Sequence, residues 1–177
     1  MPLKPQDVLV VMKWALHPGE RWTFPGLASA LGISASEAHA AVKRALQSRL
    51  LCRVGEGPAA VQPMRENLVE FLVHGLKYCF PAERGGTTRG VPTAHAVPAL
   101  AQHFGGGTGL PPVWPDPKGT VRGEGFKPLY GSAARAAAND PELYAALALI
   151  DAIRGGHARE REIAARLLTG MVMGAGR

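Results

Sequence analysis

Cysteine is scarce in this sequence, and its scarcity limits the chemistry that the chain can carry. Cys52 and Cys79 are the two cysteines among 177 residues, so the chain lacks the cysteine pairs of a disulfide framework. No Cys-x-x-Cys or His-x-x-x-His spacing occurs, and zinc sites in proteins are usually marked by such spacings. We therefore expect neither a metal nor another cofactor.

Long apolar runs and the motifs of common enzymes are also lacking. Residues 8–12 form a short apolar run with no small-residue cleavage site behind it, whereas a membrane-spanning helix needs about 20 apolar residues. The glycine-rich residues 105–109 lack the Gly-Lys-Ser/Thr ending of a phosphate-binding loop, and no Gly-x-Ser-x-Gly motif is present. These absences predict a cytoplasmic protein that has no membrane partner and is not an enzyme.

The composition that is present favours helices and an anionic partner. Hydrophobic residues make up 46% of the chain and aromatic residues 6%, and the abundant alanine has the highest helix propensity. The formal net charge is +6 and the pI is about 9.7. A basic chain attracts polyanions, of which nucleic acid is the commonest soluble one. Because the excess charge is spread along the chain, it does not locate a site.

The first third of the chain predicts three helices followed by a short hairpin. Thr23 can cap the second helix and Ser34 the third, and Glu37 follows Ser34 at the spacing of a capping box. Gly32 lies in the tight turn between these two helices. The predicted helices span residues 5–16, 24–31 and 35–48, and the predicted strands span residues 50–54 and 59–62.

The rest of the chain predicts further helices around an irregular middle. Residues 79–131 are rich in proline and glycine, which favours an extended segment with a short helix near residues 94–103 and a strand near residues 120–126. Further helices are expected at residues 65–78, 132–138, 141–154 and 157–173. The predicted fold is therefore mainly α-helical with a small β-hairpin, in two parts at residues 1–62 and 63–177.

The segment TFPGLASALGISASEAHAAVKRALQSRLL resembles a known DNA-binding domain. It is similar to the winged helix-turn-helix domains of bacterial transcriptional regulators, the MarR-like and related groups. Leu27 and Leu31 match the apolar positions of the first helix, Gly32 matches the turn glycine, and Ala38 and Val42 match the inward residues of the second helix. The resemblance implies a winged helix-turn-helix in residues 1–62, with the hairpin as its wing. It also implies a repressor or autoregulator that binds double-stranded DNA.

Under this resemblance, the helix at residues 35–48 enters the major groove. With Ala38, Val42 and Leu46 facing inward, its outward face and the segments beside it supply the contacts to DNA. The predicted DNA-binding residues are Thr23, Ser34, Ser36, His39, Lys43, Arg44, Gln47 and Arg53.

These residues are expected to have different roles. Lys43 and Arg44 would mostly meet phosphates, as would Arg53 on the wing, whereas Ser36 and His39 would lie nearest the base edges. His39 could instead contact phosphate. We also expect a homodimer, because proteins with two-fold symmetry read palindromic half-sites.

Two alternatives stay open at this point. The winged helix-turn-helix could serve protein contacts only, since the predicted recognition helix is rich in alanine. In outline, residues 65–177 resemble the tails of small bacterial proteins that pair a winged helix with such a segment and look like regulators or antitoxin-like partners of a co-encoded protein. The polar stretch ERGGTTRG at residues 83–90 is either a solvated loop or a contact to DNA phosphates, a ligand or a partner.

Overall fold

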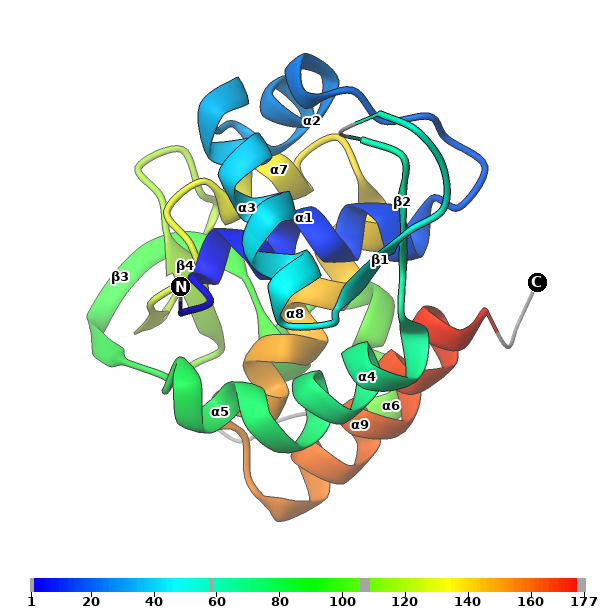
Figure 1. Cartoon of the computed structure of the whole chain (residues 1–177). Coiled ribbons are helices and arrows are strands. Elements are labelled where there is room, and N and C mark those ends of the chain that lie inside the picture. The colour runs from blue at the N-terminus through cyan, green and yellow to red at the C-terminus, as the bar shows by residue number, and fades with distance from the viewer. Residues whose placement is uncertain (1, 58, 106–108, 175–177) are drawn as a thin grey trace.

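The computed structural model describes residues 2–57, 59–105 and 109–174. Helices make up 56% of the described residues, with small sheets beside them, so the predicted mainly α-helical fold is confirmed (Figure 1). In chain order the elements are α1 (Pro5–Leu16), α2 (Phe24–Leu31), α3 (Ala35–Gln47), β1 (Leu51–Arg53), β2 (Val61–Pro63), α4 (Arg65–Glu70), the π-helical turn η1 (Phe71–Gly75), α5 (Leu76–Cys79), β3 (Arg84–Pro92), the 3-10 turns η2 (Ala94–Ala96) and η3 (Pro98–Leu100), α6 (Ala101–Phe104), β4 (Pro112–Pro115), β5 (Val121–Phe126), α7 (Ala133–Ala137), α8 (Pro141–Gly155) and α9 (Ala158–Met173).

Three helices begin where a side chain accepts a hydrogen bond from the first turn. The Thr23 hydroxyl caps α2 and the Asp140 carboxylate caps α8, each accepting from a backbone N–H three residues on. At α3, Ser34 and Glu37 form the complete capping box, with the Ser34 N–H donating to the Glu37 carboxylate at 2.9 Å. These bonds satisfy N–H groups that a helix leaves unpaired at its start, and they confirm the predicted helix starts.

The helix predicted at residues 65–78 is continuous but not uniform. It runs from α4 through the π-helical turn η1 into α5. Gly75 lies at the end of η1, where a Cβ atom would stand 3.1 Å from the Phe71 ring. The missing side chain therefore gives that ring room inside the wider turn.

The predicted extended segment at residues 79–131 contains a three-stranded sheet, of which the sequence predicts only the last strand. β3 pairs antiparallel with both β4 and β5, and β4 pairs parallel with β5, so the strands close on themselves. The helix expected near residues 94–103 is divided into η2, η3 and α6. The division comes from Val97, which is extended because it precedes Pro98.

Glycines let these short strands approach one another. A Cβ atom at Gly90 would lie 2.0 Å from the Trp114 carbonyl oxygen, and one at Gly123 would lie 2.0 Å from the Pro111 carbonyl oxygen. Side chains at these positions would therefore collide with backbone. The glycines that favour an irregular segment in the sequence are thus the residues that allow the sheet to close.

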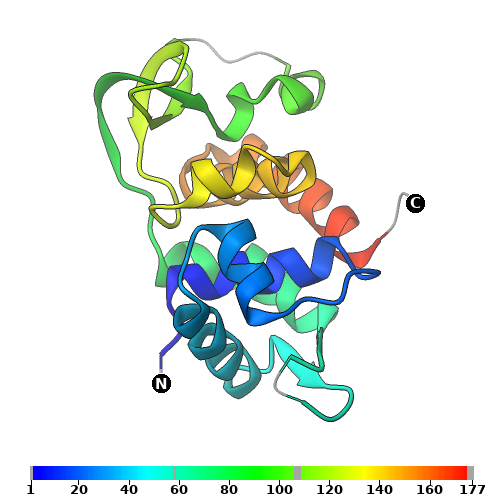
Figure 2. The same ribbon diagram turned by 90° about the horizontal axis from the view of Figure 1, so that it is seen from above.

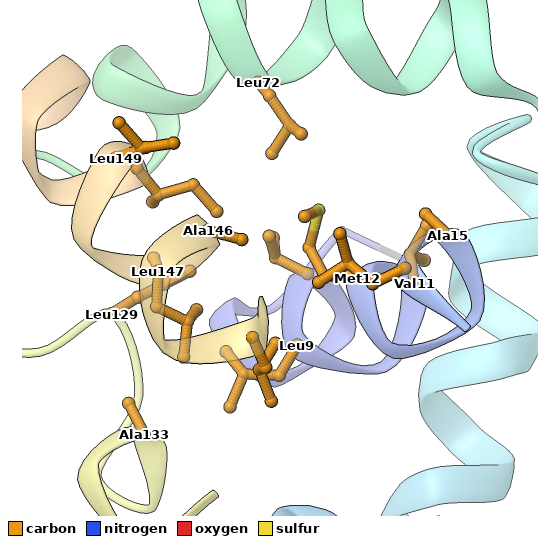
Figure 3. Packing of buried hydrophobic residues seen from close by; sticks show 14 of the residues in the cluster. Leu9, Val11, Met12, Ala15, Leu72, Leu129, Ala133, Ala146, Leu147 and Leu149 are labelled. Atoms are coloured by element: carbon orange, nitrogen blue, oxygen red, sulfur yellow. The ribbon is translucent and has the colours of Figure 1, made fainter. Parts of the chain in front are cut away.

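One apolar core extends through residues 1–62 and 63–177, the two predicted parts of the chain. Leu9 and Met12 of α1 face Ala146 and Leu147 of α8, and Leu72 of η1 approaches from another side (Figure 3). Seen from above, α8 lies between the helices α1, α2 and α3 on one side and the sheet β3–β5 on the other (Figure 2). Among the described helices, none is both long enough and apolar enough to cross a membrane.

A buried carboxylate attaches α8 to the sheet. Asp151 accepts hydrogen bonds from Thr93 Oγ1 at 2.8 Å, from Trp114 Nε1 at 2.6 Å and from Arg154 Nη1 at 2.7 Å. Burial raises the pKa of the Asp151 carboxyl, and the three donors oppose this shift because they stabilise the charged form. Arg154 also donates to the Phe80 carbonyl at 2.8 Å, so the residue that follows α5 lies beside the same arginine that pairs with Asp151.

A second carboxylate attaches α8 to α1. Asp140, at the start of α8, lies 2.5 Å from Lys13 Nζ and 2.9 Å from His17 Nε2. Burial alone would raise the pKa of Asp140. The hydrogen bonds from Lys13, the Leu143 N–H and His17 outweigh burial and hold that pKa below its ordinary value of 3.8.

Replacing Asp140 by asparagine tests this attachment, because asparagine caps a helix as well as aspartate does. We expect the free energy of unfolding at pH 7 to fall by about 3 kcal/mol, since Lys13 stays buried without its counter-charge. Urea unfolding followed by circular dichroism measures the change. Glu66→Gln, which removes an exposed charge from α4, is the control and should have almost no effect.

The wild type and the Asp140→Asn variant should also differ in how their free energy of unfolding depends on pH. The folded-state pKa of Asp140 is lowered, so its contribution is fully present above the unfolded pKa and is lost as the pH falls through the folded-state value. Between about pH 5 and pH 2, the wild type should therefore lose more stability than Asp140→Asn. Equal losses in the two proteins would contradict the ionic attachment.

Candidate nucleic-acid interface

Helices α2 and α3 are joined by a turn that requires glycine. Gly32 has a φ of 66°, a left-handed conformation that glycine adopts without strain. The Ile33 N–H bonds back to the Ala28 carbonyl at 3.1 Å. A Cβ atom at Gly32 would also stand 2.0 Å from the Arg135 guanidinium. Glycine is thus needed both for the backbone and for the close approach of a side chain from the C-terminal part.

α3 has a buried face and an exposed stripe. Ala38 and Val42 are buried, as predicted, and Leu46 packs partly buried against the same core. The solvent-facing polar side chains follow one another at intervals of three or four residues, which places them on one side of the helix. This α3 stripe consists of Ser36, His39, Lys43 and Gln47. Four predicted DNA-binding residues therefore lie together.

Arg44 does not belong to the α3 stripe, so the prediction that it lies on the outward face is wrong. Its Nη2 and Nε donate to the two carboxylate oxygens of Asp7 at 2.6 and 2.7 Å. Asp7 is fully buried in the first turn of α1, and the Arg44 side chain is 6% exposed. Each residue advances a helix by about 100°, so Arg44 points to the side of α3 that α1 covers, although Lys43 beside it faces solvent.

The predicted contacts at the helix starts are exposed. The hydroxyl oxygens of Thr23 and Ser34 accept the capping hydrogen bonds, so each hydroxyl hydrogen can still be donated to an anion. His39 packs edge-on against Phe24 with ring centroids 5.0 Å apart. This contact fixes the imidazole on the α3 stripe beside the start of α2.

The hairpin β1–β2 follows α3 directly. Its register pairs Leu51 with Pro63 and Arg53 with Val61. Arg53 is exposed toward the hairpin end, where its guanidinium donates to the Gly57 carbonyl at 3.3 Å. Figure 1 shows the hairpin beside α3, with β1 continuing from the C-terminal end of that helix. Arg53 thus supplies an exposed cation on the hairpin, six residues after Gln47 at the end of the α3 stripe.

The C-terminal part of the chain contacts the start of α3, which sequence reasoning did not predict. Tyr130 Oη donates to the Glu37 carboxylate at 3.1 Å, and Ser132 Oγ donates to the Leu31 carbonyl at 2.6 Å. Hydrogen bonds from Ser34 and then from Tyr130 lower the pKa of the Glu37 carboxyl. Tyr130 and Glu37 are 93 positions apart, so no local pattern could have revealed this pairing.

The interface offers hydrogen-bonding groups and cations rather than a metal centre. In the described part of the chain, no three His, Cys, Asp or Glu side chains converge on a point where an ion could bind. Comparisons with protein-family models, curated proteins and solved structures find no match for this chain. The candidate interface therefore rests on the geometry of α2, α3 and the hairpin.

Lys43→Ala and Arg44→Ala form a matched pair that separates an exposed cation from a buried one. Lys43→Ala should change the free energy of unfolding by less than about 0.5 kcal/mol. Arg44→Ala should lower it by about 3–5 kcal/mol, because the buried Asp7 carboxylate loses its counter-charge and keeps only the hydrogen bond from the Lys4 backbone N–H. Denaturant unfolding measures both variants.

A double variant keeps this experiment decisive if Arg44→Ala does not fold. Asp7→Leu combined with Arg44→Met removes both charges and keeps apolar volume, so it should recover most of the lost stability. About 1 kcal/mol should stay lost, because the Lys4 N–H no longer has the Asp7 carboxylate as its capping acceptor. A double variant as unstable as the single one would show that the ion pair is not the cause.

Proposed function

We propose that this protein is a winged helix-turn-helix regulator of transcription that binds double-stranded DNA in a sequence-dependent way. In this proposal α3 enters the major groove and the hairpin β1–β2 is the wing. The α3 stripe carries the proposal, because it presents polar groups and a cation on a helix whose opposite side is packed into the core. A rigid helix of this kind holds its side chains at fixed positions relative to the bases.

The exposed side chains suit distinct tasks. Lys43 and Arg53 would bind phosphates, while Ser36 and His39 would lie nearest the base edges. The Gln47 amide can pair with adenine through two hydrogen bonds. A homodimer would present two such helices to two half-sites one helical turn apart.

Binding to a protein partner is the second candidate, and the burial of Arg44 favours it. Without Arg44, Lys43 is the single cation among the four residues of the α3 stripe. Phosphate contacts supply much of the affinity of DNA-binding proteins, so one cation on this helix is a small contribution. A polar stripe with one cation also fits the surface of a co-encoded protein, as an antitoxin-like role requires.

Titration with DNA fragments from the region upstream of the protein's own gene tests the first candidate. Fluorescence anisotropy at two salt concentrations should show a preference for one fragment and an affinity that falls as salt rises, because phosphate binding releases counterions. Lys43→Ala should weaken all fragments alike and reduce the salt slope by about 0.9. Ser36→Ala or His39→Ala should instead change the preference between fragments, by about fivefold.

The control is Arg159→Ala, which removes an exposed cation from α9 and should leave affinity and preference unchanged. Absence of binding to every fragment at low salt would rule out the DNA-binding proposal. Co-expression with the products of neighbouring genes, followed by size-exclusion chromatography of the mixture, would then test the second candidate directly.

A further inference from the structure

β3 and β5 place two arginines side by side on the small sheet. Arg89 and Arg122 are register partners in an antiparallel pair. Directly opposite residues in such a pair share one face of the sheet, with Cβ atoms about 5 Å apart. Both arginines are exposed. Like charges in this position repel each other, so the pair is unfavourable unless an anion joins it.

No acid in the described residues balances the pair. Neither guanidinium has a hydrogen bond or an ion pair to another residue that the structure describes. Glu124, two residues after Arg122, forms an ion pair with Arg84 instead. At the same end of the sheet, Lys127 pairs with Glu83 at 2.8 Å. The sheet thus compensates its other charges and leaves Arg89 and Arg122 uncompensated.

The nearest acid in the β4–β5 connection also has a different role. The Asp116 carboxylate accepts a hydrogen bond from the Lys118 backbone N–H at 2.8 Å, which stabilises the turn before β5. The Asp116 N–H donates to the Arg89 carbonyl, a backbone bond that leaves the Arg89 side chain untouched. The connection therefore brings a third cation, Lys118, to the end of the sheet at which Arg89 lies, without neutralising Arg89.

The sheet holds the two arginines on a rigid frame. Gly90, next to Arg89, packs against the Trp114 backbone with no room for a side chain, and a Cβ atom at Gly119 would stand 2.3 Å from the Gly90 backbone. Trp114 in turn donates to the buried Asp151 of α8. The strands cannot separate to relieve the repulsion without breaking these contacts. Two cations kept together on such a frame are preorganised for an anion.

We propose that Arg89 and Arg122 form a binding site for a phosphate group. Each guanidinium can donate two parallel hydrogen bonds, and a phosphate has enough oxygens to accept from both at once. A single carboxylate has two oxygens and would satisfy one guanidinium only. The Thr87 hydroxyl, two residues before Arg89 and exposed on the same strand, can add a further donor.

The site lies apart from the α3 stripe. Figure 2 shows the sheet β3–β5 on one side of α8 and α3 on the other, so phosphate binding at the sheet does not depend on DNA binding by α3. The phosphate belongs either to a small free compound or to the backbone of a nucleic acid. Both sources present the same group to Arg89 and Arg122, and the experiment distinguishes them.

Inorganic pyrophosphate is the first probe, titrated calorimetrically into the full chain at constant ionic strength. We expect binding by the wild type, and Arg89→Gln or Arg122→Gln should raise the Kd about tenfold or more, because each removes charge-assisted hydrogen bonds. Arg159→Gln, the same change at an exposed position of α9, should leave the Kd unchanged. An equal loss in all three variants, or no binding at all, would overturn the site.

Unfolding without ligand gives a second readout. Arg122→Gln removes one of two repelling charges, so its melting temperature should equal or exceed that of the wild type. Pyrophosphate should raise the melting temperature of the wild type and not that of the variant. A lower melting temperature in Arg122→Gln without ligand would show that Arg122 has a stabilising partner and would contradict the proposal.

Two further probes identify the source of the phosphate. The first is a short DNA duplex, added to the Lys43→Ala variant. If this variant still binds the duplex, and adding Arg89→Gln abolishes that binding, the phosphate belongs to a nucleic acid. If the variant binds pyrophosphate but not the duplex, the phosphate belongs to a small compound. Poly-glutamate that binds as tightly as pyrophosphate would overturn the preference for phosphate and indicate an acidic protein partner. Failure of α3 to bind DNA changes none of these readouts.

Discussion

Helix α8 runs through the interior of the protein, and carboxylates near its two ends have to be paired there. Asp140 is paired with Lys13 and His17 from α1, and Asp151 is paired with Arg154 and with donors from the sheet side. A buried charge without a partner costs several kcal/mol. The two aspartates therefore determine where α1 and the sheet dock on α8, while the apolar core supplies the non-directional part of the stability.

This arrangement makes α3 part of the whole molecule rather than an independent module. Arg44 and Asp7 tie α3 to α1, and Tyr130 bonds to Glu37 at its start. Arg135 lies against the turn before α3, where Gly32 leaves room for it. The α3 stripe is consequently held by residues from both parts of the chain.

The charge distribution separates the two candidate binding surfaces. The α3 stripe is polar with Lys43 as its cation, whereas the pair Arg89 and Arg122 concentrates positive charge on the sheet. Elsewhere many basic side chains are paired: Lys13, Arg44, Arg84, Lys127 and Arg154 all form ion pairs. The net charge of +6 is thus a poor guide to where an anion binds, because pairing decides which cations remain available.

Local sequence determined the features that depend on neighbouring residues. The caps at Thr23, Ser34 and Asp140 and the glycine turn at Gly32 could be predicted, because each involves a backbone group within a few positions. The tertiary structure alone decided that Arg44 is buried and that β3, β4 and β5 form a closed sheet. Asp7 and Arg44 are 37 positions apart, and the strands close on one another with the help of Gly90 and Gly123, where a side chain would collide with the backbone of a distant segment. Such contacts leave no periodic trace in the sequence, since their energy depends on which segments the folded chain brings together.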